Sequence, residues 1–479
     1  MDFRPLNPIE DLPRLLPYFE RQPFRLSDYT AGFQLMWQPY AATAYAEAEG
    51  CLLLRTCYGG KTRFAYPLHP EADLEAELRA LSALEAWCVA NGEPLALGTI
   101  PAERLPQMTR RYGRDLALTN PRTWRDYLYT LSDFVDYAGK RFAGQRNHVS
   151  KFRRLYPNAT YRPMTAADLD AVRAFLRAFA ERQYAKNSFI ANEELNGTER
   201  LLEAFTPLRL SGGVLEVDGQ IIAVTLGETA GDTLIVHVEK ALVGYEGAYP
   251  TIAHAFAKAS QRPGLAYINR EDDAGDCGLR KSKLQYNPVQ ILDKYTIIPR
   301  RVIEELEAPP ELHTERLTLR PVAEADLHTY ARLARDLERN RLWGWDWREA
   351  WKEEGDPRDA WFLGLARDDF AARREIALGL YASVEGAETL VGEGVFHNFT
   401  YDNTVELGVR LLPEHERHGY ASEAMRAMAD YALCYWGLEK VLAKCYRENL
   451  PSQAMLTRSG LRPDHDEPAF LWFSRTAKN

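Results

Sequence analysis

The chain has 479 residues, of which 46% are hydrophobic and 27% charged, and its formal net charge is −9. This length predicts about three domains, and the composition excludes a disordered or fibrous protein. No apolar run approaches the roughly 18 residues of a membrane helix, and the start MDFRPLNPIEDL lacks the shape of a signal peptide. We therefore expect a cytoplasmic protein without integral membrane association, and its oligomeric state stays open.

The six cysteines form no C-x-x-C motif, and none lies at zinc-ligand spacing from a histidine. This usage is typical of reduced, mostly buried thiols in the cytoplasm. The sequence therefore predicts no metal site.

Residues 1–155 form the first predicted module. The stretch CLLLRTCYGGKTRFAYPL predicts a hairpin about Gly59-Gly60. The stretch ADLEAELRALSALEAWCVANG predicts a helix that ends at Gly92, and PLALGTI predicts the next strand. Because no glycine turn precedes this helix, we expect the first module to lack a cofactor site.

Residues 156–298 form the second predicted module. A basic helix over residues 140–154 joins it to the first, and Thr165 followed by Asp168 predicts a helix start. The stretch GGVLEVDGQIIAVTLGETAGDTLIVHVEKA then predicts a three-stranded meander, because Asp-Gly and Gly-Asp pairs mark its two turns.

A linker is predicted over residues 299–311, where a strand-like run gives way to an acidic stretch and two prolines. The third module, residues 312–479, begins with TERLTLRP and ends in the same order of elements as the second. That order is strand, glycine turn, helix, strand ending in Asn, short helix, strand. It runs from TLIVHVEKA to VQILDKYTII in one module and from VELGVRLL to AFLWFSR in the other.

The glycine turn carries the chemistry of this repeat. A turn that opens a helix leaves backbone N–H groups unbonded at the positive end of the helix dipole, and such groups bind a pyrophosphate. Gly419 lets the chain approach the phosphates closely, and the preceding strand can splay so that its N–H groups hold a pantetheine arm. The predicted cofactor-binding residues are Leu407, Gly408, Val409, Leu411, Arg417, His418, Gly419, Tyr420, Ala421 and Ser422.

The motifs ERHGYASEAMRAM and ENLPSQAMLTRSGLR resemble the CoA-binding core of GNAT acetyltransferases. The opening TERLTLRPVAEADL is similar to the ribosomal-protein N-acetyltransferase branch (RimJ/RimL-like) of that family. The turn departs from the family pattern, Gln/Arg-x-x-Gly-x-Gly/Ala, at its first position, Glu416. The resemblance implies that the third module binds acetyl-CoA.

The stretches VEKALVGYEGAYPTIAHAF and YINREDDAGDCGLRKSKLQYNPVQILDKY resemble the C-terminal domain of phosphatidylglycerol lysyltransferases, over residues 25–298. Those enzymes are pairs of GNAT-like units that move an aminoacyl group from tRNA to a lipid, and this sequence shows no counterpart of their membrane-spanning half. The two resemblances imply an α/β fold with mixed sheets. Two GNAT-like modules are paired at the N-terminus, and a separate one stands at the C-terminus.

Acyl transfer to an amine needs one group that takes a proton from the amine and one that protonates the departing thiolate. Glu406 and Glu393 lie on the two central strands of the third module, and either is a candidate base. The resemblance places Asn449 and Ser452 beside the CoA arm, where Ser452 would protonate the thiolate. Both residues also suit a plain helix cap.

The N-terminal part is the better candidate for an anionic partner, because most of the acid excess lies in residues 311–479. If the basic helix and the cations after Asn269 converge, they form a cationic groove for a tRNA acceptor end, a phospholipid head or CoA phosphates. If they do not converge, they form a solvated basic face. Glu239 and Lys240 alternate along one strand, so only one points into a cleft. The second-site candidates are Glu239, Lys240, Tyr245, Gly247, Asn269, Arg270, Arg280, Lys281 and Lys283.

We expect the third module to transfer an acetyl group from acetyl-CoA to an amine by direct attack, because no cysteine stands in its candidate CoA motifs as a nucleophile. Most of the aromatic cluster between Trp343 and Phe362 is expected in the core, with one or two tryptophans lining an acceptor pocket. The acceptor, a peptide N-terminus, an amino acid or a small amine, stays open.

Two alternatives remain. In one, residues 1–298 are the main catalyst of an aminoacyl-tRNA-dependent transferase with a lipid or peptide acceptor, and the N-terminal unit binds aminoacyl-tRNA or CoA. In the other, the chain is a non-catalytic binding protein.

Overall fold

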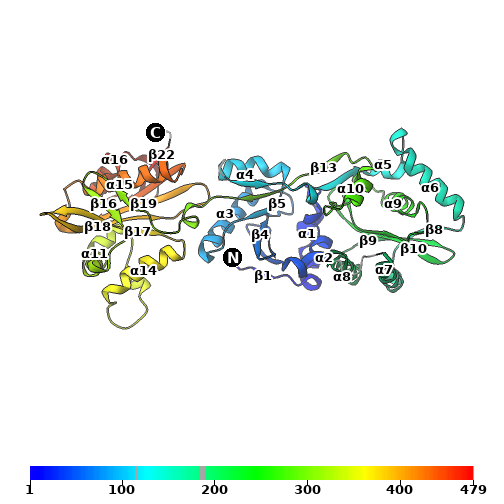
Figure 1. The fold of residues 1–479 in the computed structure, drawn as a ribbon, viewed down its shortest axis with the longest axis horizontal. Helices are drawn as coiled ribbons and strands as arrows, with labels where there is room; N and C mark the ends of the chain where they lie inside the picture. Colours follow the sequence, from blue (N-terminus) through cyan, green and yellow to red (C-terminus); the bar gives the residue numbers. More distant parts are fainter. Residues whose placement is uncertain (114–115, 184–188, 478–479) are drawn as a thin grey trace. The chain divides into compact units, whose positions relative to one another are not determined.

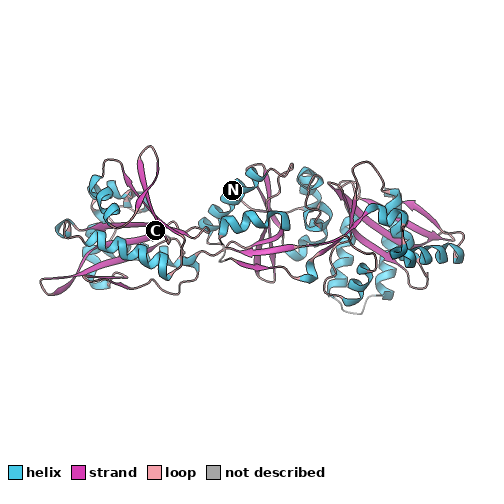
Figure 2. Ribbon diagram, turned by 90° about the horizontal axis from the view of Figure 1, so that it is seen from above, coloured by secondary structure: helices cyan, strands magenta, loops and turns pink. Residues whose placement is uncertain are grey.

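A computed structural model of the chain describes residues 1–113, 116–183 and 189–477. The chain divides into two compact units, each with helices packed on mixed β-sheets (Figures 1 and 2). The first unit comprises Met1–Trp87, Leu95–Met108 and Ala117–Ile298, and the second comprises Pro299–Asn479 with Cys88–Pro94 and Thr109–Leu116. The predicted fold class, mixed α/β in three modules, is confirmed.

The first sheet has the strand order β1-β2-β3-β4-β5-β14-β6. The hairpin about Gly59-Gly60 is confirmed, because Tyr58 pairs with Lys61 and both glycines have positive φ. The strands are β1 (Arg4–Pro5), β2 (Ala44–Ala48), β3 (Cys51–Tyr58), β4 (Lys61–Ala65), β5 (Leu97–Pro101), β6 (Ala117–Thr119) and β14 (Lys294–Ile298). The helices are α1 (Pro8–Glu20), α2 (Ala31–Ala41), α3 (Leu74–Asn91) and α4 (Leu105–Tyr112).

The second sheet has the order β13-β7-β12-β11-β10-β9-β8 and contains the predicted meander. The helix start at Thr165 is confirmed as a capping box with Asp168. The strands are β7 (Asp126–Thr130), β8 (Thr160–Pro163), β9 (Ser211–Val217), β10 (Gln220–Ala230), β11 (Thr233–Ala241), β12 (Tyr267–Asn269) and β13 (Gln290–Leu292). The helices are α5 (Leu131–Asp136), α6 (Ala143–Leu155), α7 (Leu169–Gln183), α8 (Phe189–Glu203), α9 (Ala248–Ala259) and α10 (Cys277–Leu284).

The first two sheets exchange strands. The buried strand β7 lies before the predicted boundary at residue 155, yet it pairs with β12 and β13 of the second sheet. The run expected as one strand over residues 289–298 breaks at Asp293, so that β13 stays in the second sheet and β14 returns to the first. The side chain of Asp293 accepts a hydrogen bond from Asn120 at the break. The residue ranges of the modules therefore stay a prediction.

The third sheet has the order β15-β16-β17-β18-β19-β20-β22-β21. Its strands are β15 (Leu312–His313), β16 (Leu317–Arg320), β17 (Ile376–Val384), β18 (Ala387–His397), β19 (Thr404–Leu411), β20 (Lys440–Tyr446), β21 (Arg462–Asp466) and β22 (Phe470–Thr476). Its helices are α11 (Leu327–Arg335), α12 (Leu337–Trp343), α13 (Trp347–Ala350), α14 (Asp359–Ala371), α15 (Tyr420–Asp430), a π-helical turn (Tyr431–Tyr435) and α16 (Leu450–Arg458).

Both faces of the third sheet are packed. On one face Met425 and Met428 of α15 and Leu456 of α16 form a core with Leu407 and Val441 of the strands. On the other face the aromatic side chains of α11 and α14 form a second cluster. The site described below lies on that second face and at the start of α15.

Each sheet contains one parallel pair joined by a helix, namely β4 and β5, β11 and β12, and β19 and β20. This confirms the order of strand, helix and strand in the repeat, but the end of the repeat differs from the prediction. Strand β12 ends at Asn269, whereas β20 ends three residues before Asn449, which is the N-cap residue of α16 instead.

Half of the six cysteines, Cys51, Cys88 and Cys445, are buried, so the expectation of mostly buried thiols was too strong. Within the described residues, no helix is both long and apolar enough to cross a membrane.

Candidate functional site

The parallel strands β19 and β20 stay paired for only three positions, from Thr404 with Lys440 to Glu406 with Leu442. In the described chain, no pairing between these strands extends farther, although β19 continues to Leu411. The two strands therefore separate after Glu406. This leaves one edge of β19 without a strand partner over the stretch that includes Gly408.

Helix α15 begins with an open turn. Gly419 is its N-cap residue, with φ 85° and ψ −1°, and no side chain among the described residues caps the helix start. The nearest atom to a Cβ built on Gly419 would be Arg316 Nη2, at 3.2 Å. Arg316 also donates to the carbonyl of His418 and pairs with Glu423 at 2.6 Å. The first amides of the helix therefore face a turn that, among the described residues, the guanidinium of Arg316 approaches most closely.

A groove of about 720 Å³ lies between α15 and residues 311–316 and reaches this turn. Two predicted cofactor-binding residues, Gly419 and Ser422, line its end. The other lining residues are Glu311, Leu312, His313, Thr314, Glu315, Arg316, Glu423, Arg426, Ala427, Asp430 and Tyr431.

The remaining predicted cofactor-binding residues divide into two groups. The side chains of Leu407 and Leu411 are buried in the core, and those of Val409, Tyr420 and Ala421 pack against it, so these residues offer a ligand mainly their backbone. The turn residues are exposed, and they are Arg417, with φ 61°, and His418, whose ring stacks on Tyr420.

Gly408 lies beneath Trp343. A Cβ on Gly408 would come within 2.5 Å of Trp343 Cη2, so only glycine fits there. The end of α12 therefore covers the strand gap on the face opposite α15.

Glu406 occupies the last paired position and is 4% exposed. Its Oε2 accepts a hydrogen bond from Asn398 Nδ2 at 2.8 Å, and its Oε1 lies 3.3 Å from Lys444 Nζ and 3.7 Å from His397 Nε2. Burial lowers the pKa of His397, and Lys444 lowers it further against the opposing effect of Glu406. The carboxylate thus has one cationic neighbour and one imidazole that favours its neutral form.

Glu393 lies on the same face, but a buried network holds it. Arg410 binds its Oε2 through Nε at 2.8 Å and Nη2 at 2.6 Å, and the hydroxyl of Tyr330 donates to Oε1. Arg410 also donates to Asn340 and lies over the ring of Trp343. This carboxylate positions Arg410 and is not presented to the gap.

Glu375, just before β17, is a residue that the sequence analysis missed. Burial, together with the neighbouring Glu393 carboxylate, raises the pKa of Glu375 to about 8. It could not be found from the sequence, because the two largest causes of its raised pKa, burial and Glu393, depend on packing and not on the neighbouring residues.

Asn449 and Ser452 lie at the start of α16. Asn449 caps the helix, because its Oδ1 accepts a hydrogen bond from the amide of Ser452 at 3.2 Å. Ser452 also contacts the Cys445 thiol, whose pKa is raised by burial and lowered by this contact. Since Cys445 follows the last paired position of β20, Ser452 lies next to the separated part of that strand.

The aromatic cluster is divided between core and site. Trp347 and Phe362 are buried, and Trp351 and Trp361 pack against their cluster. Only Trp343 covers Gly408.

The corresponding turn of the second module is closed. Gly247 begins α9 with φ 86° and ψ 3°, nearly the geometry of Gly419. A Cβ on Gly247 would come within 2.4 Å of the carbonyl oxygen of His148 on α6, and Tyr245 packs against Tyr156 beside it. This glycine is required by helix packing.

The gap after the second parallel pair is also bridged. Strands β11 and β12 pair at three positions, as β19 and β20 do in the third sheet. Their pairing ends at Ile235 and Asn269. Beyond it, Arg270 Nη2 lies 2.6 Å from Glu239 Oε1, and His237 Nδ1 lies 2.7 Å from Glu271 Oε1.

Lys240 points to the other face of β11, where it pairs with Glu194. His237 is fully buried between Glu228 and Glu271. Burial lowers its pKa, but the hydrogen bonds to both carboxylates outweigh burial and raise it to about 10. Asn269 is buried and donates to Asp126 at 2.8 Å.

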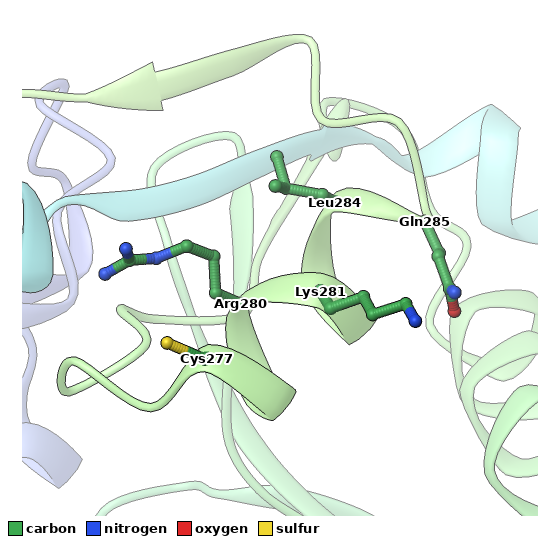
Figure 3. A pocket seen from close by; sticks show the side chains of 5 residues that line it. All are labelled: Cys277, Arg280, Lys281, Leu284 and Gln285. Atoms are coloured by element: carbon green, nitrogen blue, oxygen red, sulfur yellow. The ribbon is translucent and has the colours of Figure 1, made fainter.

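The cations of α10 differ in their partners and exposure. Arg280 and Lys281 extend in opposite directions from the helix (Figure 3). Arg280 forms two hydrogen bonds with Asp273, at 2.8 and 2.9 Å. Lys283 is buried and donates to the carbonyl of Arg270, and burial lowers its pKa to about 8. Lys281 is exposed and lines a pocket of about 440 Å³ with Cys277, Arg280, Leu284 and Gln285.

The segments that carry the two predicted basic sets meet where Gln145 of α6 donates to the carbonyl of Gln285 and Asn287 donates to that of Arg141. Burial lowers the pKa of His254, and two cations, Lys258 of α9 and Arg153 of α6, lower it further. These two cations therefore lie close together. Arg153, Arg154 and Lys258 are exposed. One group of exposed cations of this module therefore lies on α6 and α9.

Comparison with known proteins gives two family matches. The family model described as phosphatidylglycerol lysyltransferase, C-terminal, matches residues 19–298, and that of the acetyltransferase (GNAT) domain matches residues 316–462. Both resemblances stated from the sequence are confirmed.

Two proteins of Bacillus subtilis (strain 168) are similar to part of the chain. The uncharacterized N-acetyltransferase YoaA is 25% identical over 158 residues, which cover 32% of this chain and 84% of YoaA. The uncharacterized N-acetyltransferase YnaD is 33% identical over 75 residues, which cover 16% of this chain and only 44% of YnaD. A crystal structure of a conserved protein of unknown function from Bacteroides thetaiotaomicron VPI-5482 covers 62% of this chain and 99% of its own, with 27% identity and a TM-score of 0.58.

Proposed function

The chain belongs to the phosphatidylglycerol lysyltransferase C-terminal family and is a transferase of the acyltransferase class, and from this premise we propose which module does the chemistry. The C-terminal domain transfers an acetyl group from acetyl-CoA to an amine. The acceptor class includes a peptide N-terminus, an amino acid and a small amine.

The contrast between the two glycine turns carries this proposal. Gly419 and Gly247 share one backbone geometry, yet α6 closes the turn at Gly247, whereas at Gly419 a side-chain atom of Arg316 is all that the described residues bring within 4 Å of a built Cβ. An open helix start with its dipole and free amides suits a pyrophosphate. The closed turn leaves no room for one, so the donor site belongs to the third module.

The backbone amides and side chains around this turn suit acetyl-CoA as the acetyl donor. Amides at the start of α15 and the cations Arg417 and Arg316 would bind its phosphates. The separated edge of β19, from Leu407 to Val409, would hydrogen-bond the pantetheine arm and polarise the thioester carbonyl. Acetyl-CoA supplies the acyl group when bound.

Glu406 is the proton acceptor in our assignment, because it lies at the point where β19 and β20 separate and already holds a cation there. The bound ammonium gives a proton to Glu406, and the resulting amine attacks the thioester carbon. Ser452 protonates the thiolate, and Asn449 holds the start of α16 in place. Glu393 acts through Arg410 as a positioning residue.

The first unit is a second site for acyl or aminoacyl transfer or for binding in this proposal. Its family and the exposed cations Arg153, Arg154 and Lys258 favour an aminoacyl-tRNA acceptor end over CoA. Retention of charged tRNA by the full chain, weakened by added salt and by Arg153→Glu with Lys258→Glu, is the expected result. Equal retention by the double variant would contradict this assignment.

Calorimetric titration of acetyl-CoA into the full chain tests the donor site, and an acceptor screen that follows thiol release tests the reaction. We expect one binding event and thiol release that depends on an added amine. No binding, together with no thiol release from any amine, would leave the chain as a non-catalytic binding protein.

A further inference from the structure

Lys444 is an amine built into the candidate site. It lies on β20 two residues after the last paired position, on the same face as Glu406, and the register places it across the gap from Gly408. Its Nζ is 3.3 Å from Glu406 Oε1, and its side chain is 35% exposed. The lysine is therefore both at the gap and open to a ligand.

Neighbouring rings hold the lysine in this direction. Its Nζ lies 5.0 Å from the ring centre of Trp472 and 5.6 Å from that of Phe470, both on β22. Such cation–π contacts restrict a long side chain that would otherwise sample many rotamers. The ammonium therefore occupies the position that an acceptor amine must reach, beside the proton-accepting carboxylate.

We propose that Lys444 is itself an acceptor, so that the C-terminal domain acetylates its own lysine, and this inference rests on the proposed acetyl transfer. The ammonium of Lys444 loses a proton to Glu406, and its nitrogen attacks the thioester carbon. A C–N bond forms while the C–S bond breaks, and the electron pair leaves with sulfur. The nitrogen gives up its second proton as the amide forms, and the thiolate takes up one proton through Ser452 to give the free thiol.

Lys440 provides a matched internal control. It lies on the same strand and face as Lys444, but it is in the paired part of β20, where its Nζ is 2.8 Å from Asp464. The two side chains are about equally exposed, 33% and 35%, so acetyl-CoA from solution reaches both. Transfer in the site favours Lys444, because a positioned amine gains from proximity.

The test incubates the full chain with acetyl-CoA without any added amine and follows each lysine by peptide mass mapping. We expect acetylation of Lys444 at least about ten-fold faster than that of Lys440. Glu406→Gln should slow it by about 100-fold, at the lower end of what a positioned base contributes. Lys444→Arg should bind acetyl-CoA with unchanged affinity but release no thiol in the absence of an amine.

Two results would overturn the inference, and they are distinguishable. If acetyl-CoA binds and added amines are acetylated while Lys444 is modified no faster than Lys440, only self-acetylation is wrong. If acetyl-CoA neither binds nor releases thiol with any amine, the proposed function fails, and the inference fails with it.

Discussion

Glu393 and Glu406 lie on adjacent strands and face the same side of the third sheet. Their partners differ, since Glu393 is bound by Arg410 and Tyr330, whereas Glu406 faces the ammonium of Lys444 at the gap. A strand pattern cannot separate such residues, because their partners lie far away in the sequence. The sequence therefore predicted both as bases, and only packing assigns them different roles.

Substituting each carboxylate by its amide tests this division. Glu406→Gln should reduce the rate of acetyl transfer by about 100-fold or more with little change in melting temperature. Glu393→Gln should cost about 3 kcal/mol of stability, because it leaves Arg410, whose side chain is only 12% exposed, without a full counter-charge. Steady-state kinetics and denaturant unfolding measure the two effects. Equal rate losses in two equally stable variants would contradict the division.

Glu375 should make stability depend on pH. Burial and the Glu393 carboxylate raise its folded pKa to about 8, above its unfolded value. The folded state then holds this proton more tightly, so the stabilisation is fully present below about pH 4.5 and is lost as the pH rises through about 8.

In the unsubstituted chain, the unfolding free energy of the second unit should fall by on the order of a few kcal/mol between about pH 5 and pH 9. In Glu375→Gln this fall should be absent. Denaturant unfolding across that range is the measurement. The same slope in both proteins would mean that Glu375 is ionised throughout.

At the scale of elements, secondary structure could be predicted where turn and capping residues occupy the positions that a turn or helix start requires. The hairpin at Gly59-Gly60, the meander and the capping box at Thr165 all follow from local chemistry. Strand β21 was missed because all its residues are exposed and show no apolar alternation. The break at Asp293 was missed because it depends on which sheet accepts each half of the run.

The two glycine turns offer a matched pair of variants. Gly419→Ala places a Cβ in left-handed backbone, at a cost of about 1–2 kcal/mol, and should weaken acetyl-CoA binding because it distorts the open turn. Gly247→Ala has the same backbone strain and also meets the His148 carbonyl, so it should destabilise the first unit more. It should leave acetyl-CoA affinity unchanged. Calorimetric titration of acetyl-CoA into both variants measures the two affinities. Equal weakening of acetyl-CoA binding in both variants would contradict the distinction between the two turns.

At the scale of the whole molecule, the chain combines two units whose sites differ in openness. The second module bridges its strand gap with the largely buried pairs Arg270–Glu239 and His237–Glu271, while in the third the gap holds the partly exposed pair Lys444–Glu406. Buried ion pairs of this kind fix a structure, because removing one partner strands a charge. One repeat thus gives a rigid module and an open one within a single chain.

This difference predicts how the full chain melts. A ligand that binds only one folded unit stabilises only that unit, by about 2.7 kcal/mol when its concentration is about 100 times Kd. Scanning calorimetry with acetyl-CoA should therefore raise the transition of the second unit and leave that of the first unchanged. Gly419→Ala should abolish the shift, whereas Gly247→Ala should lower the first transition and preserve it. A shift confined to the first unit would place the donor site beside α9 instead, and the ion pairs across that gap would then have to open for it.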